Sequence, residues 1–254
     1  MAHASESGHW YDKEGKPCYE VPYADPSKGM RPTTLGDAKK LGLLPSVTTI
    51  INEAAKPGLE RWKQEQVLHA ALTLPRIEGE PEKDYLARIM RDSQEQAKKA
   101  AERGTAIHAA IQGSYEGRHP GPELLQHTLL ADDAITTWLK MPSGLSVEAE
   151  LSFSSPLGFG GKCDLTGDPP HFVADFKTTE KPLNSLDTYD SHWMQLAAYR
   201  EGLKIPNARC AIVYVSAVEP AARLIEIPED KLQKGWAMFK ALLDYWYART
   251  GMKR

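Results

Sequence analysis

The spacing of apolar residues along this chain changes near residue 145. Before that point apolar residues recur every three or four positions, which is the period of a helix with one buried face. After it, short runs such as LSVEAELSF alternate apolar and polar residues, which is the period of a half-buried strand. The pattern therefore predicts a helical first part and a second part that mixes strands with helices.

The first part opens with loops and continues with helices. Residues 9–32 are rich in Gly, Pro, Tyr and Asp, so we predict an N-terminal segment of hairpins and loops over residues 1–44. Ser46 has the side chain of an N-cap residue and predicts a short helix over 46–53. Further helices are expected at 58–74, 81–102, 105–117 and 122–140, with Gly104 as a break between two of them.

The second part predicts a sheet. In its first strand the alternation puts Val147, Ala149, Leu151 and Phe153 on one face, and Glu148, Glu150 and Ser152 on the other. The later runs predict, in order, strands GFGGKCDLTG and HFVADFKT, a helix at 188–203, strands ARCAIVYVSAV and ARLIEIP, and a helix at 229–250. This order is typical of an α/β core with a prefixed or inserted helical region. We place the helical region at 45–143 and the core at 144–254, within a single compact unit.

Composition excludes several classes of protein. The chain has 254 residues, enough for one large domain or two small ones, and its net charge of −3 requires any nucleic-acid surface to be local. Its three cysteines are far apart and form no CxxC pair, which argues against a zinc knuckle and an iron–sulfur cluster. Sparse cysteines, no apolar run of membrane-spanning length and no targeting pattern lead us to expect a cytoplasmic protein without a membrane partner.

One apolar stretch, FVADFKTT at 172–179, contains two charges that need an explanation. In an extended strand Asp175 and Lys177 point to the same face, while the two phenylalanines point to the other. Burying a charge is costly unless it is paired or bound to a metal. The stretch alone leaves three interpretations open, namely a structural ion pair, an exposed strand end and a catalytic centre.

Neighbouring elements bring more polar residues toward this strand. The preceding strand carries Asp164 and the one before it carries Glu148 and Glu150, although the two glutamates also fit a solvent-facing edge. Clustered carboxylates repel one another unless a cation lies among them, and an oxygen-rich site suits Mg²⁺ or Mn²⁺. His108 is a further nitrogen donor or a structural histidine. The helix at 188–203 adds a polar stripe of His192, Gln195 and Tyr199.

These motifs occur together in one order: GTxIH, a strand acid, GxxD, DxKT and QxxxY. In this order the chain resembles the PD-(D/E)xK nuclease superfamily, and within it the RecB-like exonuclease branch. DFKTTEKP, QLAAY, LPSVTTI and LERWK are similar to the mitochondrial genome maintenance exonucleases and related phage exonucleases. The resemblance covers roughly residues 44–200. It implies a restriction-endonuclease-like fold, with a mixed central sheet flanked by helices and an N-terminal helical region over the active site.

The resemblance also implies roles for individual residues. It makes Lys177 the catalytic lysine, and Glu150 the acid of the first core strand with Glu148 as its competitor. Gln195 and Tyr199 would support the lysine and the phosphate. The metal ligands would be His108, Asp164, Asp175 and the carbonyl of Phe176, around Mg²⁺ or Mn²⁺. The iron–sulfur members of the branch carry four cysteines, which this chain lacks, so no cluster is expected.

The expected substrate is DNA. Basic, hydroxyl and aromatic side chains bind phosphates and bases, and on this ground we select Ser46, Thr48, Thr49, Arg61, Trp62, Lys98, Arg103 and Thr178. For Lys98 and Trp62 a solvated helix face and a core position are the competing interpretations.

The expected activity is a metal-dependent DNA exonuclease of recombination, replication or repair, acting on single strands or DNA ends, with a recombination or single-strand-binding protein as a further partner. The alternatives are a flap endonuclease, an inactive DNA-binding module and a metal-binding protein without nuclease activity.

Overall fold

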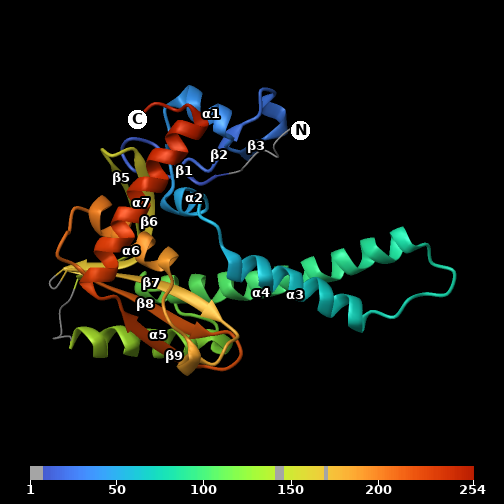
Figure 1. Ribbon diagram of the computed structural model, residues 1–254. Helices are drawn as coiled ribbons and strands as arrows, with labels where there is room; N and C mark the ends of the chain where they lie inside the picture. The colour runs from blue at the N-terminus through green and yellow to red at the C-terminus, as the bar shows by residue number, and fades with distance from the viewer. Residues whose placement is uncertain (1–7, 141–145, 169–170) are drawn as a thin grey trace.

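The centre of the molecule is a five-stranded mixed sheet with the strand order β5-β6-β7-β8-β9 (Figure 1). The computed structural model describes residues 8–140, 146–168 and 171–254. Only β7 and β8 run parallel, and the other neighbouring strands are antiparallel. The predicted α/β fold with a mixed central sheet is confirmed. The strands are β5 (Ser146–Ser155), β6 (Phe159–Asp168), β7 (Phe172–Thr179), β8 (Arg209–Ser216) and β9 (Ala222–Glu226).

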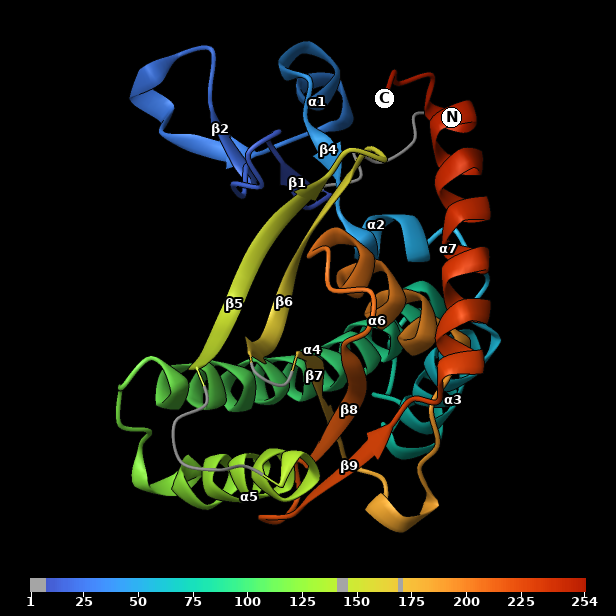
Figure 2. The ribbon, with the colours of Figure 1, turned by 90° about the vertical axis from the view of Figure 1, so that its left-hand side faces the viewer.

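Helices cover both faces of the sheet (Figure 2). One face packs against α4 (Glu82–Tyr115) and α5 (Pro122–Leu139), and the other against α6 (Asp190–Gly202), which α7 (Glu229–Thr250) covers in turn. The side-chain alternation of β7 separates the two cores as predicted. Phe172, Ala174 and Phe176 join the cluster beneath α4 and α5, whereas Val173 joins the cluster beneath α6 and α7.

The N-terminal segment docks on the far end of the β5–β6 ribbon (Figure 2). One contact is a parallel bridge between Ser46 and Gly160. A side-chain carbon added at Gly160 would lie 2.6 Å from Tyr11 Cβ and 2.7 Å from Cγ of its ring. The segment comprises β1 (Trp10–Tyr11), β2 (Glu20–Pro22), a 3-10 turn η1 (Pro26–Lys28), β3 (Met30–Pro32), α1 (Leu35–Leu41), β4 (Leu44–Pro45) and α2 (Val47–Ile51). Helix α1 was not predicted, although its capping box of Thr34 and Asp37 is visible in the sequence.

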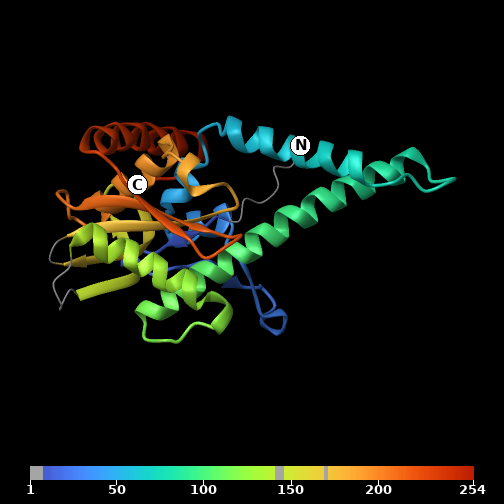
Figure 3. The same ribbon diagram turned by 90° about the horizontal axis from the view of Figure 1, so that it is seen from below.

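The expected break at Gly104 is wrong, because α4 runs without interruption for 34 residues. An interior glycine weakens a helix but does not end it. Here the glycine permits a close approach to the sheet, since an added side-chain carbon would lie 2.6 Å from Thr178 Oγ1. The first half of α4 pairs with α3 (Pro57–Thr73) in an arm that projects from the body (Figure 3). None of the described helices, α4 included, is both long and apolar enough to cross a bilayer.

The expected single apolar face of β5 is also wrong. Val147 and Ala149 pack with the cluster beneath α4 and α5, whereas Phe153 belongs to the cluster beneath α6 and α7. The change of face coincides with Glu150, whose φ of 56° lies in the left-handed region that non-glycine residues seldom adopt. The ribbon thereby crosses from one core to the other at Glu150.

Replacing Gly235 of α7 with alanine should loosen the packing of α7 on α6. The added carbon would lie 2.5 Å from the Trp193 carbonyl oxygen, a backbone atom that has no freedom to rotate away. Overpacking of this kind costs about 1–3 kcal/mol in the free energy of unfolding, measured by urea denaturation. Gly58→Ala is the matched control, because no atom lies within 4 Å of its added carbon and we expect a change within about 0.5 kcal/mol. Equal effects of the two substitutions would contradict the packing described here.

Candidate active site

The candidate site lies where β6 and β7 separate. Their ladder pairs residues 165–167 with residues 172–174, and no further pair continues it toward Asp164 and Asp175. Beyond the ladder the backbone amide of Phe176 donates to Asp164 Oδ2 at 2.9 Å instead of to a carbonyl of β6. The ladder therefore ends just before Asp164 and Asp175, and the Asp164 carboxylate is the partner of the Phe176 amide at this point.

Asp175 is held from two sides. Its side chain is 1% exposed, and Gln195 Nε2 from α6 donates to its Oδ1 at 2.8 Å. Its Oδ2 lies 2.5 Å from Lys177 Nζ, and that lysine side chain is one-third exposed. The two charges of FVADFKTT thus form an ion pair between a buried carboxylate and a lysine whose side chain is partly exposed.

Gln195 in turn is fixed by Tyr199, one helical turn further along α6. The same Nε2 donates to Tyr199 Oη at 2.9 Å, and Tyr199 is buried edge-on against the Phe153 ring. This hydroxyl faces the interior, so its support reaches Asp175 through Gln195. The structure shows no direct contact of Gln195 or Tyr199 with Lys177 in the described residues.

His108 approaches from the opposite face of the sheet. Its Nδ1 lies 3.8 Å from Asp164 Oδ2, and its ring stands edge-on to Phe176 with centroids 6.3 Å apart. Burial lowers the pKa of His108, so the imidazole is neutral near pH 7 and one of its nitrogens has a free lone pair. The unbroken α4 helix thus brings His108 beside the two aspartates.

Burial and the repulsion between carboxylates change the pKa values of the site residues. Burial, with a second contribution from Asp175, raises the pKa of Asp164 to about 8. For Lys177 burial acts to lower the pKa, but Asp175 and Asp164 outweigh it and hold the pKa above its usual value. Lys177 is therefore an ammonium ion, and the general-base role that a lowered pKa would permit finds no support in this state.

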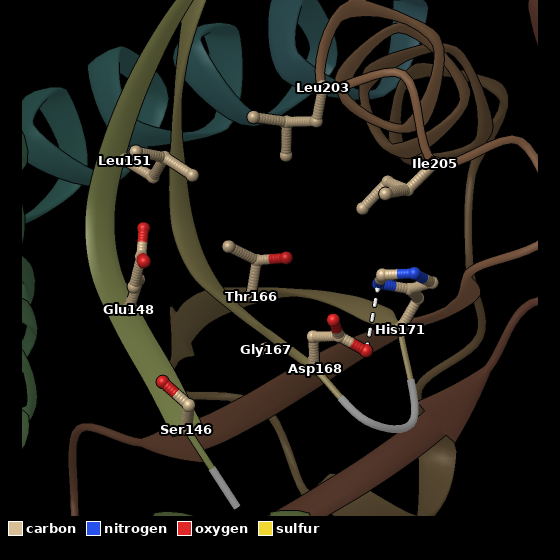
Figure 4. Close-up of a pocket in the computed structure, with 9 residues that line it drawn as sticks. All are labelled: Ser146, Glu148, Leu151, Thr166, Gly167, Asp168, His171, Leu203 and Ile205. Carbon is tan, nitrogen blue, oxygen red and sulfur yellow. Dashed lines mark ion pairs between the residues drawn. The ribbon is translucent and has the colours of Figure 1, made fainter.

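The structure separates the two glutamates of β5. Glu150 lies close enough to Asp164 and His108 to affect the pKa of each, and its carboxylate forms an ion pair with Lys162 of β6. Glu148 instead lines a separate pocket of about 180 Å³, which also contains the Asp168–His171 ion pair (Figure 4). Of the two, Glu150 has the position expected of the site acid.

Of the hydroxyl residues chosen as DNA contacts, three lie at the start of α2 and one lies near the end of β7. Ser46 is buried and acts as the N-cap of α2, with its Oγ accepting from the Thr49 amide at 3.0 Å. That oxygen also contacts the Thr48 and Thr49 hydroxyls, so Ser46 is already saturated with hydrogen bonds, while Thr48 is exposed. Thr178 lies at the end of β7, against Gly104.

The charged and aromatic DNA candidates lie along the arm. Arg61 and Lys98 are exposed and pair with Glu65 and Glu102 on their own helices. Trp62 is 37% exposed, and Arg103 is exposed near the point where α4 reaches the sheet. The geometry does not bring Arg61, Trp62 or Lys98 into contact with the two aspartates.

The sequence interpretation gave no role to three residues that the structure places around Lys177 and Glu150, although His192 was part of the predicted polar stripe. Lys56 lies at the start of α3. Its pKa is lowered mainly by burial, and the nearby charge of Lys177 adds to this lowering. His192 is buried, and burial followed by Lys177 lowers its pKa to about 4. Lys162 lies two residues before Asp164. For His192, the sequence signal was its three-residue spacing from Gln195 on the same helix.

A metal ion is expected at this site, and the donor types fit a hard divalent cation. Two carboxylates and a neutral imidazole are present, and a cation would offset both the burial and the Asp175 charge that raise the pKa of Asp164. As the side chains stand, no group of three His, Cys, Asp or Glu residues within the described part of the chain is close enough to hold one ion. The Lys177 ammonium occupies the Asp175 oxygen that a metal would need.

Comparisons with known proteins are sparse. No protein-family model matches the chain, and no curated protein does. Among solved structures it is similar to a candidate exonuclease from Eubacterium rectale, with a TM-score of 0.40 and 13% identity, over 60% of this chain and 69% of that one. It is also similar to the protein SSO0001, with a TM-score of 0.29 and 17% identity, over 49% and 58%. Similarity of this extent leaves the function to be inferred from the site itself.

Replacing Gln195 with leucine should destabilise the protein by roughly 2 kcal/mol in urea unfolding. The substitution removes the donor to Asp175 Oδ1, and a buried acceptor without its partner costs about 1–3 kcal/mol. Tyr199→Phe is the matched control, because it removes only the Gln195–Tyr199 contact and should cost about 1 kcal/mol or less. A Gln195→Leu protein as stable as the wild type would show that Asp175 does not depend on this bond.

The raised pKa of Asp164 predicts a pH effect in metal-free protein. The folded state holds the proton up to a pKa of about 8, whereas an unfolded aspartate releases it near pH 4. This contribution to stability is therefore complete below about pH 4 and is lost as the pH rises toward about 8. With EDTA present, Asp164→Asn should gain stability over the wild type between these values, most clearly at the alkaline end. A difference that is constant with pH would contradict the raised pKa.

Proposed function

We propose that the protein is a divalent-metal-dependent deoxyribonuclease, and that Asp164, Asp175 and Lys177 form its catalytic centre. The observation that carries the proposal is the contact between Asp175 Oδ2 and Lys177 Nζ at 2.5 Å, at the point where β6 and β7 separate. A purely structural ion pair has no need of a second carboxylate beside it, and Asp164 is held there by the Phe176 amide. Clustered carboxylates suit a divalent cation, and a cation together with an ammonium can neutralise the charge that develops on a phosphate during hydrolysis.

The residues themselves supply the following chemistry. The Lys177 side chain is one-third exposed and carries a positive charge beside the two carboxylates, so it can stabilise negative charge developing on a phosphate. Gln195 holds the Asp175 carboxylate in one orientation through Oδ1, which leaves Oδ2 for Lys177 or a cation. The His108 ring is neutral at neutral pH. It can therefore offer a nitrogen lone pair to a metal ion without adding a charge to the site.

Asp164, Asp175 and His108 would hold Mg²⁺ or Mn²⁺, with the Phe176 carbonyl as a further oxygen. When bound, such an ion activates a water molecule and neutralises charge on the phosphate. Binding would require Lys177 to share or leave Asp175 Oδ2. No iron–sulfur cluster is part of the proposal, because the cysteines Cys163 and Cys210 are buried and Cys18 lies in the N-terminal segment.

The finer assignment is an exonuclease acting on single strands or DNA ends, and it rests on the motif resemblance. Blocking both ends of a labelled oligonucleotide separates this activity from that of a flap endonuclease, because an exonuclease stops at a blocked end. A DNA-binding module without activity would bind the same oligonucleotide and leave it intact under Mg²⁺ and under Mn²⁺. We also propose a recombination or single-strand-binding protein as a partner of this activity.

Lys177→Met and Asp175→Asn should each reduce DNA cleavage by about 10²-fold or more, because each removes a group from the reacting site. The assay follows 5′- and 3′-labelled single- and double-stranded DNA with Mg²⁺, Mn²⁺ or EDTA, and EDTA should abolish cleavage. DNA binding should persist in both variants. The matched control is Lys181→Met, an exposed lysine four residues further along the chain, which should leave the rate unchanged. Wild-type cleavage by either site variant would overturn the assignment.

A further inference from the structure

An aromatic and basic cluster lies beside the candidate catalytic centre and has no part in the chemistry described above. Its residues are His9, Tyr11 and Tyr19 from the N-terminal segment and Lys162 from β6. Lys162 and Asp164 are two positions apart on one strand, so the cluster begins one side chain away from the proposed catalytic aspartate.

The aromatic rings of the cluster contact one another, and the buried Tyr11 anchors them. The rings of His9 and Tyr19 are stacked with centroids 4.5 Å apart and an interplanar angle of 28°. Tyr19 meets Tyr11 edge-on, and their hydroxyl oxygens are 2.7 Å apart. Tyr11 is 2% exposed and is seated on Gly160, where no side chain would fit. The cluster is therefore anchored in the core at Tyr11 and open to solvent at His9, which is exposed.

The charges of the cluster suit a nucleotide. Lys162 is a cation that forms an ion pair with Glu150, and its side chain is 36% exposed. The His9 ring is covered on one face by Tyr19, and this partial burial, followed by Lys162, lowers the pKa of His9, so that the ring is neutral near pH 7. A neutral aromatic face beside a lysine matches the base and the phosphate of one nucleotide.

We propose that His9, Tyr19 and Lys162 form a binding subsite for one unpaired nucleotide of the DNA substrate. The base stacks on the exposed face of His9, which Tyr19 supports, and the phosphate meets Lys162. Bases inside a duplex already have both faces covered, so a stacking surface of this kind selects a single-stranded segment. The subsite rests on the proposed nuclease function, because it names the strand state that the same centre would receive.

Binding is measured on the full chain in EDTA, so that cleavage plays no part in the result. The probe is a fluorescent single-stranded dT oligonucleotide, followed by anisotropy at several salt concentrations. His9→Ala and Tyr19→Leu should each weaken binding about fivefold or more, the lower end of base–aromatic stacking, and His9→Phe should restore it. Lys162→Met should reduce the slope of log affinity against log salt by about 0.7, the contribution of one phosphate contact on a single strand.

Two controls make the test specific. Tyr23→Ala removes another exposed tyrosine of the same segment and should leave binding unchanged. Oligonucleotides with a single abasic position should reveal one position at which the loss of the base weakens binding to the wild type and has no effect on His9→Ala. Matching urea midpoints for all variants establish that each one folds.

The subsite and the proposed function fail in different ways. The subsite is wrong if His9→Ala binds single-stranded DNA like the wild type, or if the substitution weakens binding to duplex DNA by the same factor. It is also wrong if the protein binds no DNA in EDTA, even where Mg²⁺ supports cleavage. If the expected binding pattern appears but Mg²⁺ and Mn²⁺ support no cleavage, the subsite stands and the nuclease proposal falls.

Discussion

The structure around the site depends on one buried carboxylate. Asp175 is 1% exposed, and a charge at such depth persists only if its oxygens have partners. Gln195 donates a hydrogen bond to one oxygen, Lys177 forms an ion pair with the other, and Tyr199 accepts a hydrogen bond from Gln195. This chain of contacts joins β7 to α6. It therefore sets the helix against the sheet as well as the orientation of the carboxylate.

The separation of β6 from β7 is the second constraint. A continued ladder would have paired the Phe176 amide with β6 and would have left no room between the strands. Instead the amide donates to Asp164, and burial, with a second contribution from the nearby Asp175, raises the pKa of Asp164. The left-handed backbone at Glu150 occurs opposite this point and moves the β5–β6 ribbon from one core to the other. Divergence, face change and acidic cluster thus occur at one level of the sheet.

Much of this arrangement is local in the sequence and could be predicted from it. The two-residue period of β7 placed Asp175 and Lys177 together, and the four-residue spacing of Gln195 and Tyr199 on one helix placed them on one side. What failed depended on distant contacts. The continuous course of α4 through Gly104 follows from its packing on Thr178, and the face change of β5 follows from two separate cores. Neither contact leaves a periodic signal. The DNA candidates were chosen by residue type alone. Ser46 was also predicted as an N-cap, and the structure confirms the cap and shows that its oxygen has no capacity left for a phosphate.

The most direct test of the central claim is a titration of the protein with Mn²⁺, with free ion followed by electron paramagnetic resonance. We predict a site in the wild type that Asp175→Asn loses and Asp168→Asn, in the separate pocket of Figure 4, keeps. Lys177→Met should bind Mn²⁺ at least as tightly as the wild type, because the ammonium no longer competes for Asp175 Oδ2. Mn²⁺ binding that is unchanged in Asp175→Asn would contradict a metal-dependent centre at this pair of charges.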